Sequence, residues 1–149
     1  MIDYEALRRL YEQRLGLVLE PLSTQLRAMV EDRIRDLPRL DRVASRAKSV
    51  ASFMEKASRS ENGKPKYSDP IRQIQDQLGV RIVIHSLSDR EAVSRRVRDY
   101  FNPIEAKIIV PESPKEFDYE AMHYIFLVPK EFHTEAFPEE HRPTEYRII

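Results

Sequence analysis

Residues 69–89, DPIRQIQDQLGVRIVIHSLSD, contain the strand around which we expect the chain to fold. From residue 79 to residue 86 the positions alternate between two sets, Val80, Ile82 and Ile84 in one and Arg81, Val83 and His85 in the other. Alternation with a period of two, in a segment rich in β-branched residues, is typical of a strand. We therefore predict an interior strand over residues 79–86.

A single carboxylate precedes this strand. Asp76 is the only acidic residue between positions 70 and 86. A carboxylate at the mouth of a buried strand suits a metal ion or a substrate hydroxyl, because its oxygens are hard ligands and good acceptors. The simpler alternative is that Asp76 caps a turn, and the spacing alone favours that alternative.

Length and composition restrict the class of protein. A chain of 149 residues with 34% charged and 41% apolar residues suits one soluble globular core. Without cysteine it has no disulfides and no cysteine-based metal site, and three glycines are too few for a glycine-rich phosphate loop. No apolar run has the length of a membrane span or of the core of a signal peptide, so we expect a cytoplasmic protein without membrane contact.

The zero net charge hides an uneven distribution of charge along the chain. Residues 39–66 hold eight Lys or Arg against three Asp or Glu, whereas residues 112–145 hold nine acidic residues against three basic ones. A basic segment in a neutral chain indicates a local anionic ligand rather than a long nucleic acid. Any grip on phosphate must then come from side chains.

The first 38 residues read as a unit of N-terminal helices, and residues 39–149 as an α/β domain. Leucines at helical spacing predict a helix over residues 3–20, with Asp3 as its N-cap, and a second helix to residue 36. Pro21 predicts a break between them. These helices carry no recognisable chemistry, and we expect them to serve packing or contact in a homo-oligomer.

A basic helix follows a predicted strand at residues 40–47. Ser49 can cap this helix, and Lys48, Ser52 and Lys56 recur every four residues, so they share one face. Arg46 stands just before the helix start, where backbone N–H groups and the helix dipole already favour anions. Three cations and a hydroxyl would suit a polyphosphate, although an ordinary solvated face explains the same pattern.

The rest of the chain alternates loops with strands. Residues 59–68 predict an exposed loop, and residues 104–110, 119–128 and 145–149 predict strands, with an acidic excursion over 129–143. His123, on an otherwise apolar strand, is more often a core residue than a catalytic one. Together the segments predict an α/β fold of the α+β type, with a mixed β-sheet flanked by helices.

Four blocks in this order resemble the synthetase domain of the RelA/SpoT family, the enzymes that make the alarmones ppGpp and pppGpp. The pattern R-x-K-x-x-x-S-x-x-x-K is carried by Arg46, Lys48, Ser52 and Lys56, and D-x-x-G-x-R by Asp76, Gly79 and Arg81. An acid-capped helix follows near Asp89, and P-K-x-x-x-Y-x-x-x-H is carried by Pro114, Lys115, Tyr119 and His123. The resemblance covers residues 40–130 and is closest to small single-domain synthetases. It implies a nucleotidyltransferase-like fold.

The resemblance implies a GTP pyrophosphokinase that transfers pyrophosphate from ATP to the 3′-OH of GDP or GTP in the stringent response. It implies catalytic roles for Asp76, Arg46, Lys48 and Lys56. Of these, the three cations would bind the ATP phosphates together with Ser52, and Asp76 would bind Mg²⁺. On the acceptor side, Tyr119 would stack on the nucleotide base, while Lys115 and His123 would hold phosphates or the sugar.

Departures from the family pattern keep other functions open. The family loop reads N-G-Y-x-S-x-H, but Phe117, Asp118 and Ala121 stand at the Asn, Gly and Ser positions. A synthetase acting on an adenine nucleotide or on the 3′ end of tRNA is therefore an alternative, although tRNA is not favoured. The family's E-x-Q segment, whose Glu helps activate the 3′-OH, is expected directly after a strand like 146–149. The chain thus resembles a synthetase domain truncated there, which would leave that strand unsupported on one side and would also fit a non-catalytic nucleotide-binding module.

Overall fold

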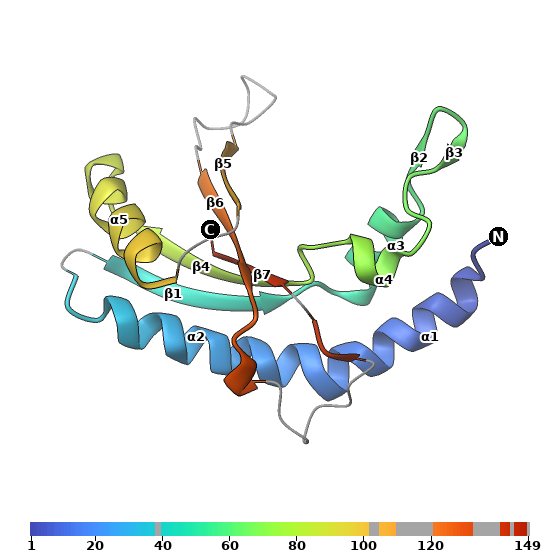
Figure 1. The fold of residues 1–149 in the computed structure, drawn as a ribbon, viewed down its shortest axis with the longest axis horizontal. Helices are drawn as coiled ribbons and strands as arrows, with labels where there is room; N and C mark the ends of the chain where they lie inside the picture. The colour runs from blue at the N-terminus through green and yellow to red at the C-terminus, as the bar shows by residue number, and fades with distance from the viewer. Residues whose placement is uncertain (38–39, 102–104, 110–120, 133–140, 144, 149) are drawn as a thin grey trace.

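The computed structural model describes residues 1–37, 40–101, 105–109, 121–132, 141–143 and 145–148, and Figure 1 shows their arrangement. A long helical segment lies across one face of a five-stranded sheet. Among the described residues, no helix is both long enough and apolar enough to cross a membrane. The predicted α/β fold with a mixed sheet and N-terminal helices is confirmed.

The N-terminal helical segment is continuous, so the predicted break at Pro21 is wrong. It comprises α1 (Tyr4–Arg14), a π-helical turn η1 (Leu15–Leu19) and α2 (Glu20–Ile34). Asp3 caps α1 as predicted, and its Oδ1 accepts the N–H groups of Glu5 and Ala6 at 3.1 Å. Proline lacks a backbone N–H and its ring clashes with the carbonyl one turn back. The wider π-helical turn before Pro21 accommodates it within the first turn of α2, where the helix needs no N–H from it.

The sheet has the strand order β1-β4-β7-β6-β5. Its strands are β1 (Leu40–Ala47), β4 (Leu78–Ile84), β5 (Glu105–Ile109), β6 (Ala121–Leu127) and β7 (Glu145–Ile148). The β4–β7 pair is parallel, and the other three pairs are antiparallel. The strand predicted in the interior of the sheet is therefore β4, which lies between β1 and β7, and β1 has the predicted bounds.

The prediction that the strand at residues 146–149 is unsupported on one side is wrong. β7 lies between β4 and β6 and forms backbone pairs with both. Tyr146 and Ile148 are each 1% exposed. The side-chain period of two explains this, because both residues belong to the face that α2 covers. β7 is thus an interior strand of the sheet.

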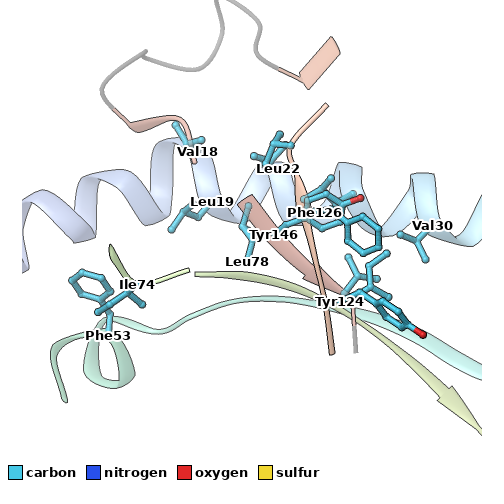
Figure 2. Close-up of a cluster of buried hydrophobic side chains, with 14 of the residues drawn as sticks. Val18, Leu19, Leu22, Val30, Phe53, Ile74, Leu78, Tyr124, Phe126 and Tyr146 are labelled. Carbon is cyan, nitrogen blue, oxygen red and sulfur yellow. The ribbon is translucent and has the colours of Figure 1, made fainter. Parts of the chain in front are cut away.

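The hydrophobic core lies between the helical segment and this face of the sheet, as Figure 2 shows. Leu78 and Val80 of β4, Tyr124 and Phe126 of β6, and the β7 pair contribute from the sheet; Leu22, Leu26, Val30 and Ile34 contribute from α2. Along β1 and β4 the other face carries Arg46, Gly79 and Arg81, and both arginines are exposed. The alternation predicted for β4 therefore separates an apolar face from a basic one.

Smaller elements connect the strands. They are α3 (Val50–Ala57), β2 (Ser60–Glu61), β3 (Lys64–Pro65), α4 (Pro70–Gln73), η2 (Leu87–Asp89), α5 (Arg90–Phe101) and η3 (Lys130–Phe132). Residues 59–68, predicted as a loop, contain the hairpin β2–β3, which projects from the sheet beyond α3 and α4 (Figure 1). Asn62 and Gly63 have φ values of 54° and 77°, as a two-residue turn of type I′ requires. The Asn-Gly dipeptide was the sequence signal for it.

Candidate active site

Pairing of two strands brings the first candidate residues together. Because β1 and β4 are antiparallel, the end of β1 lies beside the start of β4. The N–H of Lys48 donates to the carbonyl of Gln77 at 2.8 Å, one residue beyond the regular ladder. Lys48 follows β1 directly and Asp76 precedes β4 by two residues, so the ladder places their backbones side by side.

The helix α3 supplies the second lysine. The Ser49 hydroxyl accepts the N–H of Ser52 at 3.2 Å and caps the helix, as predicted. Phe53 and Ala57 are the buried residues of α3, and their burial fixes the rotation of the helix. Lys56, in the last turn, therefore extends from α3 toward the start of β4 and reaches Asp76.

Two ammonium groups contact one carboxylate. Lys48 Nζ lies 3.1 Å from Oδ2 of Asp76, and Lys56 Nζ lies 3.0 Å from Oδ1. The side chains of Lys48, Lys56 and Asp76 are 10%, 21% and 21% exposed. We call these three residues the Lys–Asp–Lys cluster. Two ammonium groups and one carboxylate give the cluster a net charge of +1. Because the cluster is partly buried, solvent and salt screen this charge less, which favours an anionic ligand.

The cluster holds Asp76 ionised. Burial alone would raise the pKa of Asp76, but the hydrogen bond from Lys56 and the charges of Lys48 and Lys56 outweigh it. The pKa of Asp76 therefore lies below its usual value. At neutral pH the carboxylate can accept hydrogen bonds or coordinate a cation without first losing a proton.

This pKa shift predicts how stability depends on pH. A carboxyl group whose pKa is lower in the folded state stabilises that state above its unfolded-state pKa, and this contribution is lost as the pH falls through the folded-state value. The Asp76→Asn variant should therefore be less stable than the native chain at neutral pH. The difference should shrink as the pH falls below about 4. Urea unfolding between neutral pH and acid measures it, with the exposed Asp41→Asn as control. A pH-independent difference would contradict the prediction.

Arg46 and Ser52 lie near the cluster in sequence but form no described contact with it. Arg46 is exposed in β1. It pairs in register with Gly79, which has no side chain of its own to contact Arg46. The Ser52 hydroxyl accepts a hydrogen bond from the Ser49 hydroxyl at 3.0 Å and is exposed. Of the four predicted phosphate-binding residues, the structure thus joins Lys48 and Lys56 through Asp76.

The predicted acceptor-binding residues fall largely outside the described part of the chain. Lys115 and Tyr119 belong to residues 110–120, which the structure does not describe. His123 is in β6, where its backbone pairs with Lys107 of β5. Their roles stay predictions.

Several residues around the cluster were not foreseen. Tyr11, Arg14 and Gln77 form buried hydrogen bonds at the ends of β1 and β4. The sequence shows that Tyr11 and Arg14 are one helical turn apart, but no neighbouring residue in the sequence indicates their hydrogen-bond partners.

These features define a class of protein: an α/β domain with a mixed sheet, in which two lysines and one aspartate meet at the ends of neighbouring strands. Residues 45–146, more than half of the chain, match the family model described as "Region found in RelA / SpoT proteins". The chain belongs to the RelA/SpoT family.

Solved structures of small alarmone synthetases have the same fold. Small alarmone synthetase 1 from Bacillus subtilis bound to its product pppGpp is 22% identical with a TM-score of 0.59, over 94% of this chain and 72% of that chain. The same synthetase bound to AMPCPP is 18% identical with a TM-score of 0.60, over 94% and 69%. A GTP pyrophosphokinase family protein from Streptococcus pneumoniae is 20% identical with a TM-score of 0.52, over 99% and 68%. A search of curated proteins found no match.

Proposed function

We propose that this chain transfers the pyrophosphate group of ATP to the ribose 3′-OH of GDP or GTP, forming ppGpp or pppGpp. The Lys–Asp–Lys cluster carries this proposal, because it is a cationic, partly buried site in a chain of the RelA/SpoT family. The solved synthetase with the same fold that is bound to pppGpp supports it. In the reaction, O3′ attacks the β-phosphorus of ATP, the bond from this phosphorus to the α–β bridging oxygen breaks, AMP leaves, and the O3′ proton passes to a base.

The cluster suits this reaction because Lys48 and Lys56 can exchange their ion pairs with Asp76 for contacts with phosphate. Without ligand, Asp76 neutralises part of the charge of Lys48 and Lys56. When a triphosphate binds, the ammonium groups can turn to phosphate oxygens, each gaining a charge-assisted hydrogen bond worth about 1.5–3 kcal/mol. They would also stabilise the negative charge that develops on the bridging oxygen as the bond to AMP breaks. Arg46, exposed beside Gly79, would offer a planar fork to the same phosphates, with Ser52 as a lesser contact.

The donor set at Asp76 fits Mg²⁺ bound together with a nucleotide. Among the described residues, no group of three or more histidine or acidic side chains could hold a metal ion by itself. Mg²⁺ usually binds through one or two carboxylates plus substrate phosphates, which matches one ionised aspartate beside a phosphate site. Asp76 would hold the ion, which would supply positive charge that offsets part of the negative charge of the phosphates.

For the proton of O3′ we propose Glu145 as acceptor. The parallel register of Gly79 with Arg147 and of Val80 with Ile148, continued by two residues, brings Glu145 level with Gln77, the neighbour of Asp76. Glu145 therefore belongs to the strand next to β4, at the level of the residue that follows Asp76. On the acceptor side we propose that Tyr119 stacks on the base and that Lys115 and His123 hold phosphates or sugar.

Two further properties are part of the proposal. ATP and GTP as substrates favour the cytoplasm as its compartment. We also propose a homo-oligomer, to which Leu10 and Leu17 of the N-terminal helical segment, 41% and 53% exposed, would contribute apolar contacts.

The test is to mix the chain with labelled ATP and a panel of acceptors, with and without Mg²⁺. We expect a 3′-pyrophosphorylated guanine nucleotide and AMP, formed only with Mg²⁺. Product on an adenine nucleotide or on tRNA would instead identify the other acceptor class, which Phe117, Asp118 and Ala121 leave open. Nucleotide binding without product on any acceptor would reject the enzymatic function and support a binding module.

A further inference from the structure

The N-terminal helix reaches the site through a tyrosine. The Tyr11 hydroxyl donates to the backbone carbonyl of Lys48 at 2.6 Å, in a buried hydrogen bond. The Tyr11 ring stacks on Phe53 of α3 with a centroid distance of 3.8 Å and an interplanar angle of 1°. Both aromatic residues are 0% exposed. One side chain of α1 therefore touches both the end of β1 and the helix that supplies Lys56.

An arginine one turn later reaches the other strand. Arg14 Nε donates to Oε1 of Gln77 at 2.7 Å, and Nε2 of Gln77 donates to the carbonyls of Ile71 and Ile74 at 2.7 Å each. The Gln77 carbonyl in turn accepts the N–H of Lys48. Tyr11 and Arg14 thus hold the two backbone segments that carry Lys48 and Asp76.

The burial of Arg14 is costly. Arg14 is 5% exposed, and burial lowers its pKa to about 10, so it stays charged at neutral pH. Among the described residues it takes part in no ion pair, and its hydrogen bond goes to a neutral amide. A buried arginine without a counter-charge is unfavourable for stability alone. A role in shaping the neighbouring site explains why the fold contains it.

We propose that Tyr11 and Arg14 are positioning residues, which fix the ends of β1 and β4 so that the side chains of Lys48 and Asp76 meet the nucleotide phosphates in one geometry. The proposal rests on the proposed function and gives the N-terminal helix a part in it. Neither residue touches substrate in this account. Tyr11 acts through the backbone of Lys48, and Arg14 acts through Gln77.

The first experiment removes only the hydroxyl of Tyr11. Tyr11→Phe keeps the stack on Phe53, and we expect ATP affinity to fall about three- to ten-fold, the worth of one buried hydrogen bond. Tyr4→Phe, exposed on the same helix, is the matched control and should leave affinity unchanged. Arg14→Met should weaken binding similarly, with the exposed Arg9→Met as its control.

Testing Tyr11→Phe in the Lys48→Met variant separates an effect on the position of Lys48 from an effect on the stability of the fold. Lys48→Met removes the ammonium group but keeps the carbonyl that Tyr11 contacts. Adding Tyr11→Phe to Lys48→Met should lower thermal stability as much as it does in the native chain, yet should cause no further loss of ATP affinity. An equal loss of affinity in both backgrounds would show that Tyr11 acts on general stability and would overturn the proposal.

A third measurement needs no ligand. The amide of Lys48 exchanges its hydrogen only when its bond to Gln77 opens, so Tyr11→Phe should speed this exchange about three- to ten-fold relative to Ile125 in β6. Unchanged relative exchange would overturn the positioning role even if ATP binds. If the native chain binds no ATP, the proposed function fails, and the exchange rate alone decides on Tyr11.

Discussion

An Asp76→Asn variant is expected to lose pyrophosphate transfer by about a hundredfold or more, while its affinity for ATP without Mg²⁺ is kept or increased. Loss of the carboxylate removes the ligand that we propose for Mg²⁺. Metal stabilisation of transition-state charge is worth several kcal/mol, of which about 2.7 already corresponds to a hundredfold. Lys48 and Lys56 are then released from their ion pairs and stay available to the phosphates. The transfer rate should therefore fall while the affinity for ATP without Mg²⁺ does not.

The measurement is a Mg²⁺ titration of both transfer rate and ATP affinity. The native chain should bind ATP differently as Mg²⁺ rises, whereas the variant should show no such response. Asp41→Asn, an exposed aspartate of β1, controls for loss of one negative charge and should behave like the native chain. A variant with a native Mg²⁺ response would exclude Asp76 as the ligand. A parallel fall in affinity without Mg²⁺ would instead indicate a collapsed site.

A Tyr146→Ala variant is expected to lose about 3–5 kcal/mol of unfolding free energy, a large part of the 5–15 kcal/mol typical of a domain. Tyr146 is 1% exposed in an interior strand, and its ring stacks on Phe126 with a centroid distance of 5.4 Å. Truncation leaves a cavity between α2 and the sheet, which the rigid strands on both sides of β7 cannot close.

Chemical unfolding with circular dichroism measures this loss, which should lower the melting temperature by about 10 °C. Tyr146→Phe keeps the ring and its stack on Phe126, so it should cost much less than Tyr146→Ala. Tyr4→Ala, at a residue 37% exposed, should change stability little. A small effect of Tyr146→Ala would mean that β7 does not lie inside the sheet.

Local patterns predicted much of this fold correctly. The alternation at residues 79–86 and the cap at Ser49 follow from the chain geometry of strands and helices, which acts over a few residues. The predicted helix face shared by Lys48 and Lys56 is wrong, because α3 begins at Val50 and Lys48 lies before it, where it continues the pairing of β1 with β4. The local signal failed at Pro21, where a π-helical turn accommodates the proline inside one helix. The predicted loop at residues 59–68 contains a hairpin whose two-residue turn is Asn62-Gly63, a dipeptide typical of such turns.

The sequence by itself determined the apolar and basic faces of β4, the capped helix that carries Lys56, and the order of motifs that marks the RelA/SpoT family. Only the tertiary structure decided that both lysines share Asp76, that β7 is an interior strand, and that Tyr11 and Arg14 hold the strand ends. The reason is that a period in the sequence fixes which face a side chain takes within its own element. Which strands become neighbours, and hence which distant side chains meet, depends on how all the apolar faces are buried together.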